Sequence, residues 1–165
     1  MAKVVVDTSV LINFCHADRL DLLGGIERFE FVVPAEVDVE VVLPKQRSLL
    51  AVALERGDLA RVSTDDPEVL SRMAGLRDQS LGLGEAACVA VAAVRGWLVA
   101  CDERRRFLRV AEATLGSGRV VDTAGLLLTA IREGLITPRE ADGVKATLER
   151  HRFSMRFRSF EDLVR

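Results

Sequence analysis

Three aspartates occupy the same context in the sequence, each between a short apolar run and a stretch with helical character: Asp7, Asp102 and Asp122. Ligands of open α/β sheets bind outside the carboxyl ends of the parallel strands, so we expect these side chains along one edge of a sheet. Glu85 opens an apolar helix-like stretch just before the strand expected to deliver Asp102, and Glu40 follows the second expected strand.

Clustered carboxylates indicate a bound cation. Like charges repel, and removing them from water is unfavourable unless a positive charge compensates. Oxygen ligands suit Mg²⁺ or Mn²⁺ rather than zinc. Such ions activate water and offset charge on a phosphoryl group, so these residues favour a metal-dependent phosphodiesterase or phosphatase.

A structural role is the alternative for each acid. Aspartate is a preferred helix N-cap, worth about 1 kcal/mol. An acid in the first turn of a helix, such as Glu85, complements the helix dipole. Each aspartate alone fits a cap as well as a ligand, but their joint occurrence with Glu85 favours a site. Glu36 and Asp38 are expected to be solvated, because their spacing leaves at most one of them facing the same way as Glu40.

The elements that position these acids alternate between strands and helices. Strands are expected at about 4–6, 29–33, 59–63, 97–101 and 119–121, and helices at about 8–15, 34–43, 45–56, 66–79, 85–94, 103–113, 124–133 and 139–151. This alternation predicts an α/β fold with a mostly parallel sheet and helices on both faces. We expect residues 1–165 to form a single domain, with a core over about 1–135 and a C-terminal helix and basic tail over about 136–165.

Composition limits the class of protein. Hydrophobic residues make up 49% of the chain and the net charge is −2, which argues against disorder and against a protein that coats nucleic acid electrostatically. Cys15, Cys88 and Cys101 are scattered and odd in number, so we expect neither a disulfide framework nor a structural zinc site. The longest apolar run, 86–94, is too short for a membrane span. A cytoplasmic location is expected.

Four segments together resemble a known family: Val-Val-Asp-Thr-Ser-Val-Leu-Ile at 5–12, Val-Pro-Ala-Glu-Val-Asp-Val-Glu-Val at 33–41, Leu-Gly-Leu-Gly-Glu-Ala-Ala-Cys-Val-Ala-Val-Ala at 81–92, and Leu-Val-Ala-Cys-Asp-Glu-Arg-Arg-Arg at 98–106. In order and spacing, the chain resembles a PIN-domain ribonuclease, close to the VapC-like toxins and the free-standing prokaryotic PIN proteins. Segments 120–127 and 133–137 are similar to the free-standing subgroup. The resemblance implies a three-layer α/β/α sandwich around a mostly parallel sheet.

The resemblance also implies an activity: metal-dependent cleavage of single-stranded RNA by metal-activated water, leaving a 3′-hydroxyl, in the toxin of a toxin–antitoxin pair. The implied cofactor is Mg²⁺ or Mn²⁺. The implied partners are the RNA substrate, a second copy in a homodimer, and an antitoxin that covers or fills the acidic cleft. No membrane partner is expected.

The residues that match the family's acidic catalytic set are Asp7, Glu40, Glu85 and Asp102. The expected metal ligands are Asp7, Glu85, Asp102 and Asp122. Thr8 or Ser9 matches the small hydroxyl residue that holds Asp7 or a metal-bound water. Two positions depart from the family pattern. Glu103 stands where many relatives have a second aspartate, and Asp122 stands where the free-standing subgroup often has glycine, which leaves a cap as its alternative role.

Basic residues near these acids are candidates for binding RNA phosphates: Arg104, Arg105, Arg106 and Arg109. A solvated helix face is the alternative. The stretch 150–158 interleaves arginine with phenylalanine. It fits a nucleic-acid platform, a surface for an antitoxin peptide, or an edge strand or loop whose phenylalanines pack on the core.

Two other classes of function remain open. One is a PIN-like binding module without catalysis, which would bind no metal. The other is a different acidic-site phosphohydrolase, such as a phosphatase of the same layered architecture. The Asp-x-Asp signature of one large phosphatase class is absent after the first strand, because Ser9 occupies the third position.

Overall fold

The computed structural model describes residues 1–103 and 105–165. A five-stranded parallel sheet lies at its centre in the order β3-β2-β1-β4-β5. The strands are β1 (Ala2–Val6), β2 (Phe29–Pro34), β3 (Ala60–Val62), β4 (Leu98–Ala100) and β5 (Val120–Val121). β1 occupies the middle, and its Val4, Val5 and Val6 are fully buried. A β-branched run of this kind suits a strand covered on both faces.

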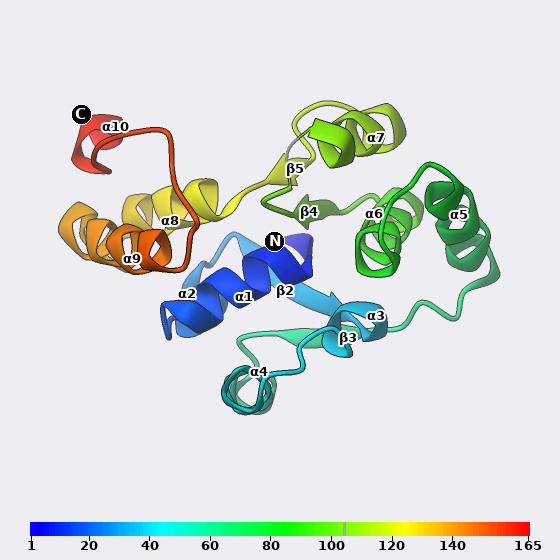
Figure 1. The fold of residues 1–165 in the computed structure, drawn as a ribbon, viewed down its shortest axis with the longest axis horizontal. Helices are drawn as coiled ribbons and strands as arrows, with labels where there is room; N and C mark the ends of the chain where they lie inside the picture. The colour runs from blue at the N-terminus through cyan, green and yellow to red at the C-terminus, as the bar shows by residue number, and fades with distance from the viewer. Residues whose placement is uncertain (104) are drawn as a thin grey trace.

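Helices cover both faces of the sheet (Figure 1). One group comprises α1 (Thr8–His16), α2 (Asp21–Gly25), α4 (Pro44–Arg56), α8 (Thr123–Arg132) and α9 (Pro138–Arg150). The other comprises α5 (Pro67–Asp78), α6 (Leu83–Arg95) and α7 (Arg105–Leu115). Two short helices complete the fold, α3 (Ala35–Asp38) and α10 (Glu161–Val164). The expected α/β/α sandwich with a parallel sheet is confirmed.

α6 is the most buried helix of the fold and lies against β1, β2 and β4. Residues 86–92 are all fully buried, as expected for a segment that is apolar on every side. The helix begins at Leu83, two residues earlier than predicted. Glu85 is therefore its third residue, and its Oε2 accepts a hydrogen bond from the Gly82 N–H at 2.8 Å.

The helix after β2 is shorter than predicted. α3 ends at Asp38, and Glu40 lies in the following turn, where its N–H donates to the Val37 carbonyl at 3.1 Å. The prediction that this helix carries Glu40 is therefore wrong. β-branched residues follow at Val39 and Val41, and they lower the helix propensity of this stretch.

The two other acids of α3 are not simply solvated, so that expectation is also wrong. Glu36 accepts a hydrogen bond from Thr64 at 2.6 Å. Asp38 accepts from Arg47 at 2.6 Å and from Arg61 at 3.1 Å. Partial burial raises the pKa of Asp38, but hydrogen bonds from the two guanidiniums outweigh it and hold the pKa below its ordinary value.

The C-terminal tail folds back onto the helices as a loop followed by α10. Phe160 is fully buried, and Phe153 and Phe157 pack against the core. Asp142 of α9 accepts from the Ser159 hydroxyl at 2.6 Å and from the Phe160 N–H at 2.9 Å. Of the arrangements considered for the tail, the structure has the loop whose phenylalanines pack on the core.

Helices long and apolar enough to span a membrane do not occur among residues 1–103 and 105–165.

Candidate active site

Asp7 lies at the carboxyl end of the central strand and is almost completely buried, with 3% exposure. Its N–H donates to the Ala100 carbonyl at 2.9 Å, which extends the pairing of β1 with β4. Oδ2 accepts from the Ser9 N–H at 3.1 Å, the Ser9 hydroxyl at 2.7 Å and the Cys101 thiol at 3.4 Å. These donors all bind one oxygen and leave Oδ1 free of these contacts. Asp7 is thus both the N-cap of α1 and a fixed carboxylate at the sheet edge.

Asp102 is held by the elements on either side of it. Oδ1 accepts from the Thr123 N–H at 2.8 Å, and Oδ2 accepts from the Thr123 hydroxyl at 2.6 Å and from Asn13 Nδ2 at 2.7 Å. The pKa of Asp102 is raised above its ordinary value, chiefly by burial. Hydrogen bonds from Thr123 and Asn13 lower this pKa in part, and the charge of Asp122 raises it further. The carboxylate is therefore oriented by α1 and by the first turn of α8.

A single hydroxyl connects the two aspartates. Ser9 Oγ donates to Asp7 and accepts from the Asp102 N–H at 3.1 Å. The expected supporting role of Ser9 thus has a geometric basis. Thr8 donates instead to Glu40 Oε2, so the two adjacent hydroxyls orient different acids.

Glu40 is placed by contacts distant in sequence. Besides Thr8, the Gly84 N–H at the start of α6 donates to Glu40 Oε1 at 3.2 Å. A Cβ atom at Gly84 would lie only 2.8 Å from either carboxylate oxygen of Glu40. A side chain at this position would therefore displace the Glu40 carboxylate from its present place.

The acids divide between two adjoining cavities. One cavity, of about 300 Å³, is lined by Asp7, Thr8, Ser9, Glu40, Gly82, Glu85, Glu103 and Arg106. We call it the acidic cleft. Among the described residues, four carboxylates and one guanidinium line the cleft, and that guanidinium, of Arg106, lies 3.7 Å from Glu85. This imbalance gives the cleft a negative potential that attracts cations.

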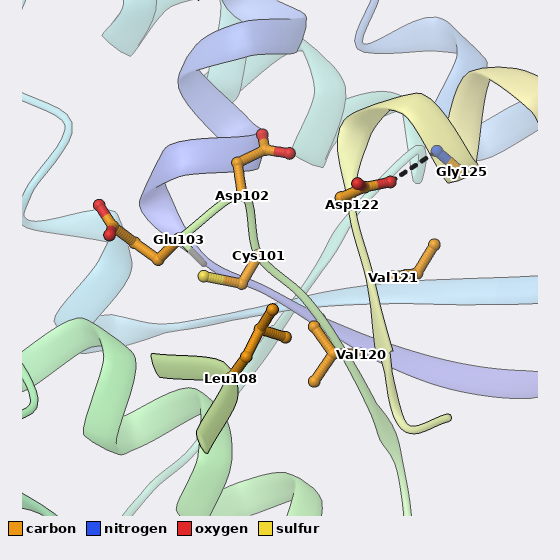
Figure 2. Close-up of a pocket in the computed structure, with 8 residues that line it drawn as sticks. All are labelled: Cys101, Asp102, Glu103, Leu108, Val120, Val121, Asp122 and Gly125. Carbon is orange, nitrogen blue, oxygen red and sulfur yellow. Dashed lines mark hydrogen bonds between the residues drawn. The ribbon is translucent and has the colours of Figure 1, made fainter. Parts of the chain in front are cut away.

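The second cavity, of about 380 Å³, contains Asp102 and Asp122 and shares Glu103 with the acidic cleft. In Figure 2, Asp102 and Asp122 project on the same side of this cavity, whereas Glu103 points away from them. Asp122 Oδ1 accepts from the Gly125 N–H at 2.8 Å and caps α8. The cap expected as the alternative role of Asp122 is thus present, and the side chain also lines the cavity.

The structure tests whether these residues fit a metal ion. Their donors are carboxylate oxygens, which suit a hard divalent cation. In the part of the chain that the structure describes, no group of three His, Cys, Asp or Glu side chains is gathered closely enough to enclose one ion. Asp7, Asp102, Glu40 and Glu85 instead accept hydrogen bonds from the protein. The donor chemistry fits a metal, and binding would require these carboxylates to reorient.

Several functional contacts were missed by sequence reasoning. Asn13, Cys101 and Thr123 all donate to an acid of the site, and each is buried. Asn13 carried a signal, because it is a polar residue within the apolar stretch 10–15. Thr123 directly follows a candidate ligand, but its bond to Asp102 depends on how β4 and β5 pair.

The candidate RNA-binding arginines separate in the structure. Arg106 lines the acidic cleft, whereas Arg105 and Arg109 line a different groove on α7. Arg104 lies outside the described residues.

The molecule is a parallel α/β/α sandwich with acidic side chains at the carboxyl edge of its sheet. A family model described as "DUF3368: PIN domain" matches residues 3–165. The chain therefore belongs to the PIN-domain family, as the sequence resemblance predicted. PIN domains are generally nucleases and generally use divalent metal ions.

Solved structures share the fold at low sequence identity. One is the structure of VapBC2 from Rickettsia felis bound to a promoter DNA fragment. Its sequence is 14% identical to this chain and its TM-score is 0.53, and the match covers 73% of this chain and 98% of that chain. PAE2754 from Pyrobaculum aerophilum is 14% identical with a TM-score of 0.53, over 78% and 90%. Among curated proteins, no sequence matches this chain.

Proposed function

We propose that this protein is a metal-dependent endoribonuclease that cleaves single-stranded RNA. The observation that carries the proposal is the acidic cleft itself. In a chain of the PIN-domain family, four carboxylates, those of Asp7, Glu40, Glu85 and Glu103, line one cavity beyond the carboxyl ends of parallel strands.

The proposed roles divide among the residues of the two cavities. The metal ligands are Asp7, Glu85, Asp102 and Asp122, and Glu40 completes the catalytic acids. A bound Mg²⁺ or Mn²⁺ would activate water and offset charge on the scissile phosphate. Ser9 and Cys101 orient Asp7, while Asn13 and Thr123 orient Asp102. Thr8 and Gly84 orient Glu40.

Substrate class is the direct test of this proposal. Purified protein is incubated with a labelled single-stranded RNA, the same RNA in a duplex, and p-nitrophenyl phosphate, each with Mg²⁺, Mn²⁺ or EDTA. We expect metal-dependent cleavage of the single strand alone. Turnover of p-nitrophenyl phosphate without RNA cleavage would instead identify a phosphatase. Absence of both activities, with no heat of Mn²⁺ binding in calorimetry, would identify a non-catalytic module.

We further propose that this enzyme is the toxin of a toxin–antitoxin pair. Support comes from the fold shared with VapBC2 and from three exposed apolar side chains close in sequence to Glu40. Val39, Val42 and Leu43 are 69%, 72% and 56% exposed, and they flank Glu40 in sequence. Exposed apolar residues gathered in this way mark interaction sites. We expect the product of the adjacent gene, when co-expressed, to bind the protein and inhibit its RNA cleavage.

Two further proposals concern self-association and location. We propose a homodimer, to be tested by sedimentation velocity. A cytoplasmic location fits the three free, buried cysteines Cys15, Cys88 and Cys101, because a reducing compartment keeps thiols free. The homodimer follows from the family resemblance and the location from the cysteines, and neither changes the chemistry of the cleft.

A further inference from the structure

α7 and the C-terminal tail form an open groove that the proposed reaction does not use. We call it the arginine groove. It measures about 880 Å³ and is lined by Arg105, Leu108, Arg109, Glu112 and Ala113 of α7 and by Arg156 of the tail. Phe107, Val110 and Ala111 bury the opposite face of α7, which turns its arginines outward.

The arginines of this groove are not neutralised locally. Arg105, Arg109 and Arg156 are exposed, and across residues 1–103 and 105–165 no carboxylate lies within 4.0 Å of their guanidiniums. Glu112 is the one acid lining the groove. The groove is therefore a positive surface on a chain whose net charge is −2. Such a surface selects a polyanion.

The arginine groove adjoins the acidic cavities. Leu108 lines both this groove and the cavity that holds Asp102 and Asp122. Glu103 joins that cavity to the acidic cleft. Figure 2 shows Leu108 near Cys101 and Val120 in the cavity that holds Asp102 and Asp122. Three adjoining hollows therefore lead from the carboxylates, past Leu108, to the arginines, and we call this row of hollows the track.

We propose that single-stranded nucleic acid leaves the cleft along this track and is held through its phosphates by Arg105, Arg109 and Arg156. Arg105 and Arg109 are four residues apart on one helix, about 6 Å along its axis. Their planar guanidiniums can bind phosphate oxygens in a bidentate manner. Leu108 between them offers an apolar surface for a base. The proximity of the groove to a cleft proposed to cut phosphodiesters favours nucleic acid over an acidic peptide.

The inference rests on the proposed function for its location, and binding tests it separately from cleavage. The probe is a fluorescein-labelled 12-nucleotide single-stranded RNA, measured by fluorescence anisotropy in EDTA at several salt concentrations. The variants are the single Arg105→Ala, Arg109→Ala and Arg156→Ala substitutions and their triple combination. Arg139→Ala is the matched control, because Arg139 is an exposed arginine on α9, in the other group of helices.

We expect the triple variant to weaken RNA binding about tenfold or more at low salt, while the control binds like the wild type. Each lost phosphate contact should lower the slope of log affinity against log salt by about 0.7, so the triple variant should lose about 2. RNA binding by the triple variant equal to that of the control would overturn the proposal. So would a labelled poly-glutamate peptide that binds more tightly than RNA and depends on the same arginines.

Failure of the proposed function gives a different result. If the wild-type protein binds RNA through these arginines in EDTA but cleaves nothing with Mn²⁺, the arginine groove is supported and the nuclease activity is contradicted. If the protein cleaves RNA but binds it independently of these arginines, the nuclease activity is supported and the role of the arginine groove is contradicted.

Discussion

Ser9 shows how a single small side chain organises the candidate site. Its hydroxyl donates to Asp7 and accepts from the Asp102 N–H, so it ties the end of β1 to the segment after β4. Cys101 adds a weaker donor to the same oxygen of Asp7. Burial, strengthened by the charge of Asp7, raises the pKa of the Cys101 thiol far above its ordinary range, so this thiol stays protonated and remains a donor.

Gly84 provides a test of how Glu40 is placed. We expect Gly84→Ala to lower RNA cleavage about tenfold or more, because the new methyl group would displace the carboxylate of Glu40, a proposed catalytic acid. Gly143→Ala is the matched control, since a Cβ there meets nothing within 4 Å on another helix. The control should raise the unfolding free energy by about 0.5–1 kcal/mol without changing activity. Wild-type rates of RNA cleavage by Gly84→Ala would contradict this account.

At the scale of the element, α8 is capped by Asp122, the same acid that lines the cavity at its N-terminus. Asp122 caps the helix through Gly125, while Thr123 in its first turn holds Asp102. The two possible roles of Asp122, cap and ligand, predict different responses to substitution.

Two substitutions separate these roles. Asp122→Asn keeps the cap, so the unfolding free energy should stay near the wild-type value, whereas Asp122→Ala should lower it by about 1 kcal/mol. If Asp122 is a ligand, both variants should weaken Mn²⁺ binding, because neither retains the charge. Chemical denaturation and calorimetry measure the two effects. Full metal affinity in Asp122→Asn would show that this residue is a cap alone.

The contact between α1 and the end of α9 should respond to pH. The ring of His16 stacks on the ring of His151 at a centroid distance of 3.8 Å. Nε2 of Gln46 lies 3.4 Å from Nε2 of His16. Burial, and then the charge of His151, lower the pKa of His16. Below the ordinary histidine pKa of about 6.5, the unfolded chain therefore binds more protons than the folded one, and stability falls as the pH decreases.

Replacing the titrating ring tests this sign. His16→Phe keeps an aromatic ring but cannot be protonated. Between about pH 7.5 and pH 5.5, this variant should lose less unfolding free energy than the wild type in urea denaturation. An identical pH dependence in the two proteins would show that His16 does not contribute.

Local patterns predicted the elements that depend on local physics. The β-branched run at 4–6 predicted a strand buried on both faces, and the apolar stretch 85–94 predicted a buried helix. Glu40 was assigned to a helix but lies in a turn, because the contacts that hold it come from Thr8 and Gly84, which are 32 and 44 residues away. The bond from Asn13 to Asp102 spans 89 residues and was likewise not visible in the sequence.

At the scale of the whole molecule, charge is divided between the acidic cleft and the arginine groove, which lie on either side of the cavity of Asp102 and Asp122. The acidic cleft collects carboxylates at the edge of the sheet, and the arginine groove collects guanidiniums from α7 and the tail. A net charge of −2 conceals this division. The tail can contribute Arg156 only while Phe160 and its contacts with Asp142 keep it folded against α9.

The anchoring of the tail is a prediction about stability. Phe160→Ala should lower the unfolding free energy by about 3–5 kcal/mol, because the fully buried ring leaves a cavity. Leu163→Ala is the control, since Leu163 lies in the same short helix with 39% exposure and should change stability far less. Equal, small losses in urea denaturation would show that the tail is not anchored through Phe160.

The claim that Asp7 belongs to a metal-dependent nuclease site has one most direct test. Cleavage of a labelled single-stranded RNA is measured with Mn²⁺ and with EDTA, for the wild type and for Asp7→Asn. Asparagine preserves the size of the side chain and can still cap α1, but it lacks the charge that a metal ligand needs. We predict cleavage by the wild type with Mn²⁺ only, and none by Asp7→Asn. Equal cleavage by the two purified proteins would contradict the account.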